Sequence, residues 1–213
     1  MNDQDLRTSI DFFRAQLETW PLPGLVPVLA RLLAAGEPVT VADVAKAGGW
    51  TPGQVRAALS RHPGTDWDAA GRILGFGLTL RPTPHSFAFD DDGGTVYGFC
   101  ASDTLAFPVL LGRPGAAGSS CPVTGQPIRV RLDTERVLRI DPPQAVVSKV
   151  RPAHALADIR AEACALGHFF ASADAAAAAG WLAQYPHGQV VPVAEDFEIT
   201  RQTMTELGWA LNR

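Results

Sequence analysis

The chain has 213 residues, a hydrophobic content of 46% and a formal net charge of −4. This length is enough for one large domain or two small ones with a proper core, and the acidic balance excludes a general attraction for nucleic acid. The apolar runs are shorter than the roughly 20 residues that cross a bilayer, so no membrane span is expected. The polar, acidic start "MNDQDLRTSIDF" does not resemble a secretory signal, and we therefore expect a cytoplasmic protein with reduced thiols.

Helix signals dominate the first third of the chain. Three- and four-residue apolar spacing, capping residues and glycine stops predict helices at residues 6–20, 25–35, 40–49 and 51–62. Thr40 and Thr51 suit the N-cap positions of the last two, and Gln54 completes a capping box with Thr51. A hairpin follows, with its turn at residues 68–71. Helices closed by a hairpin are typical of a winged helix, so we predict a winged-helix-like N-terminal domain over residues 1–80.

The charge on this domain decides between DNA binding and a scaffolding role. The helix expected to read DNA carries Arg56 and Arg61, but Asp43, Asp66 and Asp68 lie nearby in the sequence. Phosphate contacts dominate the affinity of proteins for DNA. We therefore expect this domain to be a scaffold and nucleic acid not to be a partner.

The remainder mixes strands and helices, so the predicted fold class is α+β, with a mixed or antiparallel sheet and flanking helices over residues 81–213. Strands are expected at "HSFAF", "TVYGF", "QPIRVRLD", "RVLRID", "AVVSKV" and "QVVPV", the third to fifth forming a meander. Helices are expected at residues 102–112 with Pro108 near the start, at 155–162, after a cap at Ser172, and at 195–211. Arg129 and Arg131 alternate with apolar residues, which indicates a sheet with one covered face.

Three widely spaced cysteines, Cys100, Cys121 and Cys164, indicate free thiols rather than disulfides. Their spacing fits neither a structural zinc site nor a C-x-x-C redox pair. Cys100 stands where a strand meets a helix, and Asp103 follows within one turn. Cys164 precedes "LGHFF", where the glycine permits a close backbone approach.

Several interpretations of these residues remain open on their chemistry alone. A single cysteine is most often a small buried hydrophobe, and Asp103 suits a helix cap. His168 lies too close to Cys164 in sequence for the usual cysteine–histidine hydrolase. Two converging thiolates would instead hold a soft metal, and a desolvated carboxylate with a raised pKa would accept and return a thiol proton. Metal capture with proton delivery describes cleavage of a metal–carbon bond.

The stretches "GFGLTLRPTPHSFAF", "YGFCASDTLAFPVLLGR", "SSCPVTGQP" and "CALGHFFAS" together resemble the organomercurial (alkylmercury) lyase family. The resemblance runs in order from about residue 10 to the C-terminus. It implies that Cys100, Asp103 and Cys164 are catalytic and that Cys121 is structural. Members often carry a second cysteine after the later catalytic one, where this chain has Ala165.

The resemblance further implies protonolysis of R–Hg⁺ to R–H and Hg(II), with Hg(II) held as product by Cys100, Cys164 and Asp103 and with no cofactor. The expected partners are a small organomercurial substrate, cellular thiols and a mercuric reductase that accepts Hg(II). Phe99, Phe107 and Phe169 either line an apolar pocket for the organic group or serve only as core. The alternative is a winged-helix thiol sensor for soft metals, or a mercury-binding protein without turnover.

Overall fold

The computed structural model describes residues 3–20, 22–91, 93–150, 152 and 154–211. The helices in chain order are α1 (Asp3–Glu18), α2 (Leu25–Leu33), α3 (Val41–Gly48), α4 (Pro52–Leu59), α5 (Ala101–Leu111), α6 (Ile159–Glu162), the 3₁₀ helix η1 (Cys164–Leu166), α7 (Ala173–Ala178), α8 (Trp181–Gln184) and α9 (Val193–Glu206). The strands are β1 (Asp66–Trp67), β2 (Ile73–Phe76), β3 (Leu78–Thr79), β4 (His85–Phe89), β5 (Thr95–Gly98), β6 (Gly115–Ser120), β7 (Pro127–Leu132), β8 (Val137–Asp141), β9 (Val146–Val150), β10 (Phe169–Phe170) and β11 (Gly188–Pro192).

Two sheets organise the strands. The larger has the order β1-β2-β3-β5-β4-β6-β7-β8, and the smaller has the order β10-β9-β11. Every strand pairing in the described residues is antiparallel. In β7 the residues alternate between exposed and buried, because Ile128, Val130 and Leu132 face the core while the arginines between them face water. The α+β prediction agrees with this architecture.

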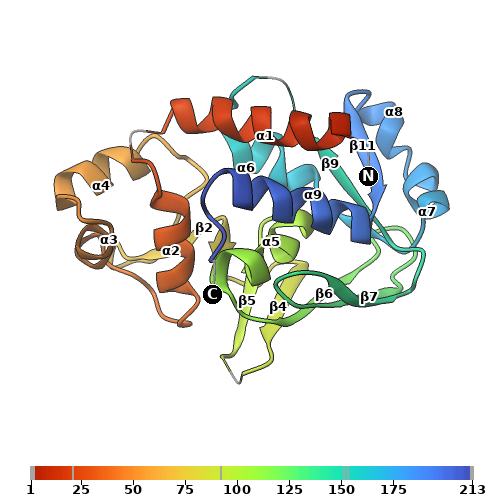
Figure 1. Cartoon of the computed structure of the whole chain (residues 1–213), viewed down its shortest axis with the longest axis horizontal. Coiled ribbons are helices and arrows are strands. Elements are labelled where there is room, and N and C mark those ends of the chain that lie inside the picture. The colour runs from red at the N-terminus through yellow and green to blue at the C-terminus, as the bar shows by residue number, and fades with distance from the viewer. Residues whose placement is uncertain (1–2, 21, 92, 151, 153, 212–213) are drawn as a thin grey trace.

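Helix α5 is the centre of the molecule. It contacts β4, β5 and β6 of the larger sheet and β9 of the smaller one, and α9 packs on it. Helix α1 in turn lies on α9, so the first helix of the chain covers the last helix (Figure 1). The N-terminus of α5, which begins directly after Cys100, is therefore enclosed by segments distant in sequence.

The N-terminal helices form as their capping residues predict. Thr51 caps α4 in a capping box with Gln54, and Thr40 caps α3 in a second box with Asp43. Together α2, α3 and α4 lie at one end of the molecule (Figure 1). Strand β3 pairs with β5, so the hairpin of this region is continuous with the larger sheet.

Four sequence expectations are wrong in detail. Pro108 lies in the second half of α5 rather than near its start, at a buried position where core packing offsets the lost backbone hydrogen bond. Strand β9 leaves the expected meander and joins β10 and β11. The helix expected at 155–162 is the single turn α6, and the last helix, expected at 195–211, spans Val193–Glu206. The alanine-rich helix α7 begins after its cap Ser172, as predicted.

Candidate active site

The strand-to-helix junction before α5 fixes a thiol and a carboxylate against each other. Cys100 is the N-cap of α5 and Asp103 is its third residue, and the two form a capping box. The Asp103 carboxylate oxygen Oδ2 accepts hydrogen bonds from the backbone N–H groups of Phe99 and Cys100, both at 2.9 Å. The backbone N–H of Asp103 points at the Cys100 sulfur. The cap role considered for Asp103 is therefore present, and it also holds the carboxylate beside the thiol.

The second thiol arrives on η1, whose loop is tied to the start of α5. The Ala101 N–H donates to the Gly167 carbonyl at 3.1 Å. A side chain at Gly167 would place its Cβ 2.8 Å from the Cβ of Cys100, so the glycine permits the close approach that the sequence indicated. Ser148 of β9 holds the same loop, donating to the Leu166 carbonyl at 3.1 Å and accepting from the His168 N–H at 3.0 Å.

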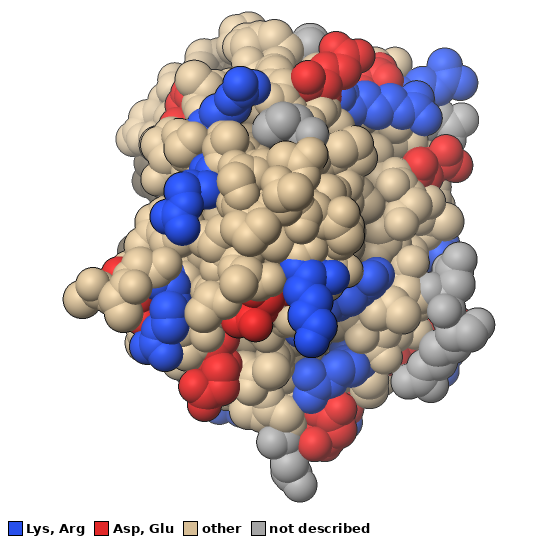
Figure 2. Space-filling view, turned by 90° about the vertical axis from the view of Figure 1, so that its left-hand side faces the viewer, with Lys and Arg blue, Asp and Glu red and all other residues tan. Residues whose placement is uncertain are grey.

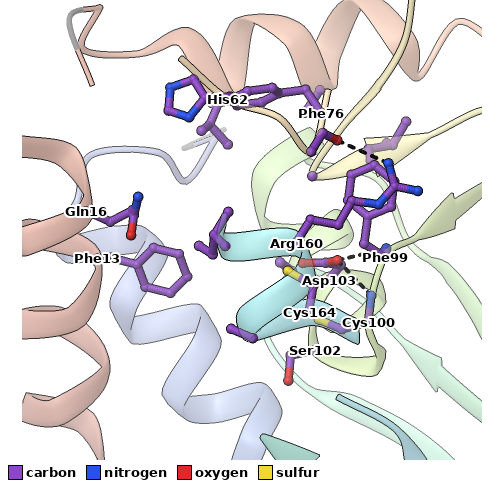
Figure 3. Close-up of a pocket in the computed structure, with 18 of the residues that line it drawn as sticks. Phe13, Gln16, His62, Phe76, Phe99, Cys100, Ser102, Asp103, Arg160 and Cys164 are labelled. Atoms are coloured by element: carbon purple, nitrogen blue, oxygen red, sulfur yellow. Dashed lines mark hydrogen bonds between the residues drawn. The ribbon is translucent and has the colours of Figure 1, made fainter. Parts of the chain in front are cut away.

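The structure brings the three sequence-predicted site residues together. One ligand atom from each of Cys100, Asp103 and Cys164 lies within 4.8 Å of the others (Figure 3). Cys100 is buried and Cys164 is half-buried. The two sulfurs, which are 64 positions apart in sequence, therefore lie close enough in space for one large cation to bind both.

The cluster keeps the Cys100 proton in place at neutral pH. A hydrogen bond with the Cys164 side chain, burial, and the negative charge of Asp103 together raise the pKa of the Cys100 thiol well above its usual range. The Asp103 N–H acts in the opposite direction and lowers this pKa. Ionising Cys100 therefore requires both a cation for its sulfur and an acceptor for its proton.

An apolar cavity of about 160 Å³ opens beside the cluster. Its aromatic walls come from α1 and the residues just after it, the hairpin, the α5 region and the C-terminal segment, namely Phe12, Phe13, Trp20, Phe76, Phe99, Phe107 and Trp209. A dry cavity of about 150 Å³ is large enough to hold benzene. Phe99 and Phe107 line the cavity, which is one of the two roles considered for them, whereas Phe169 is buried elsewhere, against the ring of His85.

The segment that leads to Cys164 is held by residues for which the sequence gave no signal. Gln16 of α1 makes two hydrogen bonds with the backbone of Leu156, at 3.1 and 2.9 Å. Arg160 of α6 donates to the Asp66 carboxylate at 2.6 Å and to the Gly64 carbonyl at 3.1 Å. Its guanidinium also lies 3.9 Å from the centre of the Phe99 ring. These contacts join the N-terminal region to residues 156–163, several of which line the cavity. We call this segment the cover of the cavity.

Cys121 lies apart from the cluster, in the turn after β6. Its N–H donates to the Gln126 carbonyl and its carbonyl accepts from Gly125, both at 2.9 Å. Burial acts to raise its pKa, but hydrogen bonds from Thr124 and from nearby backbone groups, Ala171 among them, lower it overall. The structural role expected for Cys121 stays a prediction.

Two thiols and a carboxylate enclosed by an α+β fold at an apolar cavity define a class of proteins that holds a soft metal beside an apolar group. Two family models match the chain: alkylmercury lyase over residues 78–205 and the helix-turn-helix domain of alkylmercury lyase over residues 16–77. The chain belongs to the alkylmercury lyase family.

Individual relatives agree with this assignment. An alkylmercury lyase of Streptomyces lividans is 46% identical over 179 residues, which are 84% of this chain and 81% of the relative. One from Staphylococcus epidermidis is 40% identical over 200 residues, 91% of this chain and 90% of the relative. A crystal structure described as the mercury-bound form of MerB2 superimposes with a TM-score of 0.77 at 20% identity, covering 94% of this chain and 98% of that one. It shows the same fold.

Proposed function

We propose that this chain is an alkylmercury lyase that cleaves R–Hg⁺ by protonolysis to R–H and Hg(II). The observation that carries the proposal is the convergence of Cys100, Asp103 and Cys164 within 4.8 Å beside an apolar cavity. The two sulfurs suit mercury, the cavity suits the organic group, and the carboxylate suits the movement of one proton. These roles use the chain's own side chains and require no resident cofactor.

Capture comes first. The more accessible sulfur, that of Cys164, replaces the small thiol that carries the substrate, and the proton of Cys164 leaves with that thiol. The organic group enters the cavity. The carboxylate of Asp103 then accepts the proton of Cys100, and the Cys100 thiolate forms the second sulfur–mercury bond. The raised pKa of Cys100 delays its ionisation until the cation is present.

Cleavage follows from the electron density that two thiolates push through mercury onto carbon. The protonated Asp103 donates its proton to that carbon, and the electron pair of the carbon–mercury bond becomes the new carbon–hydrogen bond. Asp103 returns to the carboxylate form, and Hg(II) remains on the two sulfurs as product. Because Asp103 is held by the N–H groups of Phe99 and Cys100, its position is set before substrate arrives.

Product release needs competing ligands, for which we propose cellular thiols and a mercuric reductase in the cytoplasm. No helix in the described part of the chain has the length and apolarity needed to cross a membrane.

We propose that the N-terminal region, residues 1–80, is a scaffold that covers a catalytic region over residues 81–213. The proposal is based on Phe13 and Gln16, which reach the cavity from this region. On the face that Figure 2 shows, basic groups are interspersed with acidic ones, which does not favour nucleic acid as a partner.

The test is turnover. The protein is mixed with phenylmercury and an excess of a small thiol, and benzene in the headspace is measured over time. Many benzene molecules per protein support the lyase, whereas mercury uptake without benzene supports the sensor or binding protein and contradicts the proposal. Cys100→Ser and Cys164→Ser should each lose turnover, and Cys121→Ser is the matched control.

A further inference from the structure

A buried ion pair borders the proposed site without belonging to the mercury-binding cluster. The Lys149 ammonium of β9 donates to Asp196 Oδ1 at 2.7 Å, and the Ser102 hydroxyl of α5 donates to Asp196 Oδ2 at 2.6 Å. Asp196, on α9, is fully buried, and Lys149 is 4% exposed. One carboxylate thus joins a helix, a strand and a second helix.

The two residues that Asp196 holds are neighbours of the mercury-binding groups. Ser102 stands between Cys100 and Asp103 in the first turn of α5, and both Ser102 and Lys149 line the cavity. The Ser102 hydroxyl points away from the sulfurs (Figure 3). Lys149 follows Ser148, which holds the loop of Cys164. The network therefore links the element that carries one sulfur and the acid to the strand that positions the other sulfur.

A buried ion pair of this kind is weak evidence for a role in stability. Taking two charges out of water is unfavourable, and an apolar pair of similar volume often gives equal or greater stability at such positions. An isolated buried carboxylate would be worse still, which explains why Asp196 has donors on both of its oxygens. A role in fixing geometry is therefore the better reason for a buried polar network beside an apolar cavity.

We propose that Asp196 is a positioning residue for the cleavage reaction and that Lys149 and Ser102 are its two anchors. Together they hold the first turn of α5 against β9, so that Asp103 stays within reach of both the Cys100 proton and the mercury-bound carbon. This inference rests on the proposed lyase activity. Proton transfer is sensitive to such placement, because a displacement of about 1 Å can lower a rate by about 10²-fold.

The test replaces the charges without leaving one of them unpaired. The double variant Lys149→Met with Asp196→Leu keeps the volume apolar, and Ser102→Ala removes one anchor only. Glu198→Gln is the control, because Glu198 pairs with Arg201 on the same helix α9 but is partly exposed. Each protein is assayed for kcat and KM with phenylmercury, for its thermal midpoint, and for the ultraviolet absorption of its Hg(II)–thiolate complex.

We expect the double variant to keep its thermal midpoint and KM while kcat falls about 10- to 100-fold. We expect a smaller fall in kcat for Ser102→Ala and a changed Hg(II)–thiolate absorption in both, with none of these effects in Glu198→Gln. A kcat within twofold of the wild type in a folded double variant overturns the inference. If the double variant does not fold, a kcat within twofold of the wild type in Ser102→Ala overturns the inference instead. If the wild type releases no benzene, the lyase proposal fails, and an unchanged Hg(II) spectrum then rejects the positioning role independently.

Discussion

Arg160→Ala tests whether the N-terminal region holds the cover of the cavity. Arg160 contributes three contacts between α6 and the rest of the molecule: an ion pair with Asp66 at 2.6 Å, a hydrogen bond to the Gly64 carbonyl at 3.1 Å, and a guanidinium 3.9 Å from the centre of the Phe99 ring. The substitution removes all three. Asp66 keeps a donor, because Thr79 donates to its other oxygen at 2.8 Å.

The size of the effect follows from these contacts. A hydrogen bond to a charged group contributes about 1.5–3 kcal/mol, and a cation–π contact at a partly exposed site contributes about 0.5–1 kcal/mol. The Arg160 side chain is 36% exposed, which weakens the ion pair. We therefore expect the docked state of α6 to lose about 2–3 kcal/mol relative to an opened state. At about 1.36 kcal/mol per factor of ten, the opened population rises about 30- to 150-fold.

Native-state proteolysis measures that population when opening is fast relative to cleavage. Thermolysin cuts before apolar residues, and Leu156 and Ile159 lie in the segment that Arg160 anchors. Cleavage before these two residues, identified by mass spectrometry, should accelerate about 30-fold or more in Arg160→Ala. Arg136→Ala is the matched control, because Arg136 is 78% exposed and lies 3.8 Å from Asp133. Acceleration below threefold would show that Arg160 does not hold the cover.

Other substitutions test the buried histidine, the acid and the third thiol. Burial, with a smaller effect of His168, lowers the pKa of His85 from 6.5 to about 4. The unfolded chain therefore takes up a proton at this residue first as the pH falls. In urea unfolding, His85 alone should account for about 2–3 kcal/mol of the stability lost between pH 7 and pH 4.5. In His85→Gln this slope between pH 4 and 6.5 should be smaller, and an unchanged slope would exclude His85 as its source. Asp103→Asn keeps a carbonyl acceptor for the helix cap, so its thermal midpoint should stay near that of the wild type while turnover falls about 10²-fold or more; Asp103→Ala should lose turnover and also about 1 kcal/mol of stability in urea unfolding. Normal turnover in Asp103→Asn would refute the proton role. Cys121→Ser should show the reverse pattern, with about 1–2 kcal/mol of lost stability and turnover within twofold of the wild type.

Local signals in the sequence were enough to predict much of the fold. Thr51 and Gln54 specify the start of α4 through contacts three residues apart, and the alternation in β7 records which face of the sheet is covered. Both depend on near neighbours, so both can be interpreted without the rest of the chain. The partner of a strand cannot be predicted from near neighbours alone. Strand β9 leaves the expected meander because β10 and β11, which follow it in sequence, pair with it instead.

The same distinction applies to the site. Cys100 and Asp103 are linked by local cap geometry, and the resemblance to a known family supplied Cys164. The contacts of Gln16 with Leu156, across 140 positions, and of Lys149 with Asp196, across 47, are set by tertiary packing. A glutamine on a mostly apolar helix face and a lysine in a strand gave no sign of these partners.

X-ray absorption at the mercury edge tests the central claim most directly. The full chain, loaded with one equivalent of Hg(II), should show two sulfur neighbours at bonding distance, and Cys164→Ser should reduce these to one while Cys121→Ser leaves two. A single sulfur neighbour in the wild type, or two that persist in Cys164→Ser, would contradict the shared site of Cys100 and Cys164.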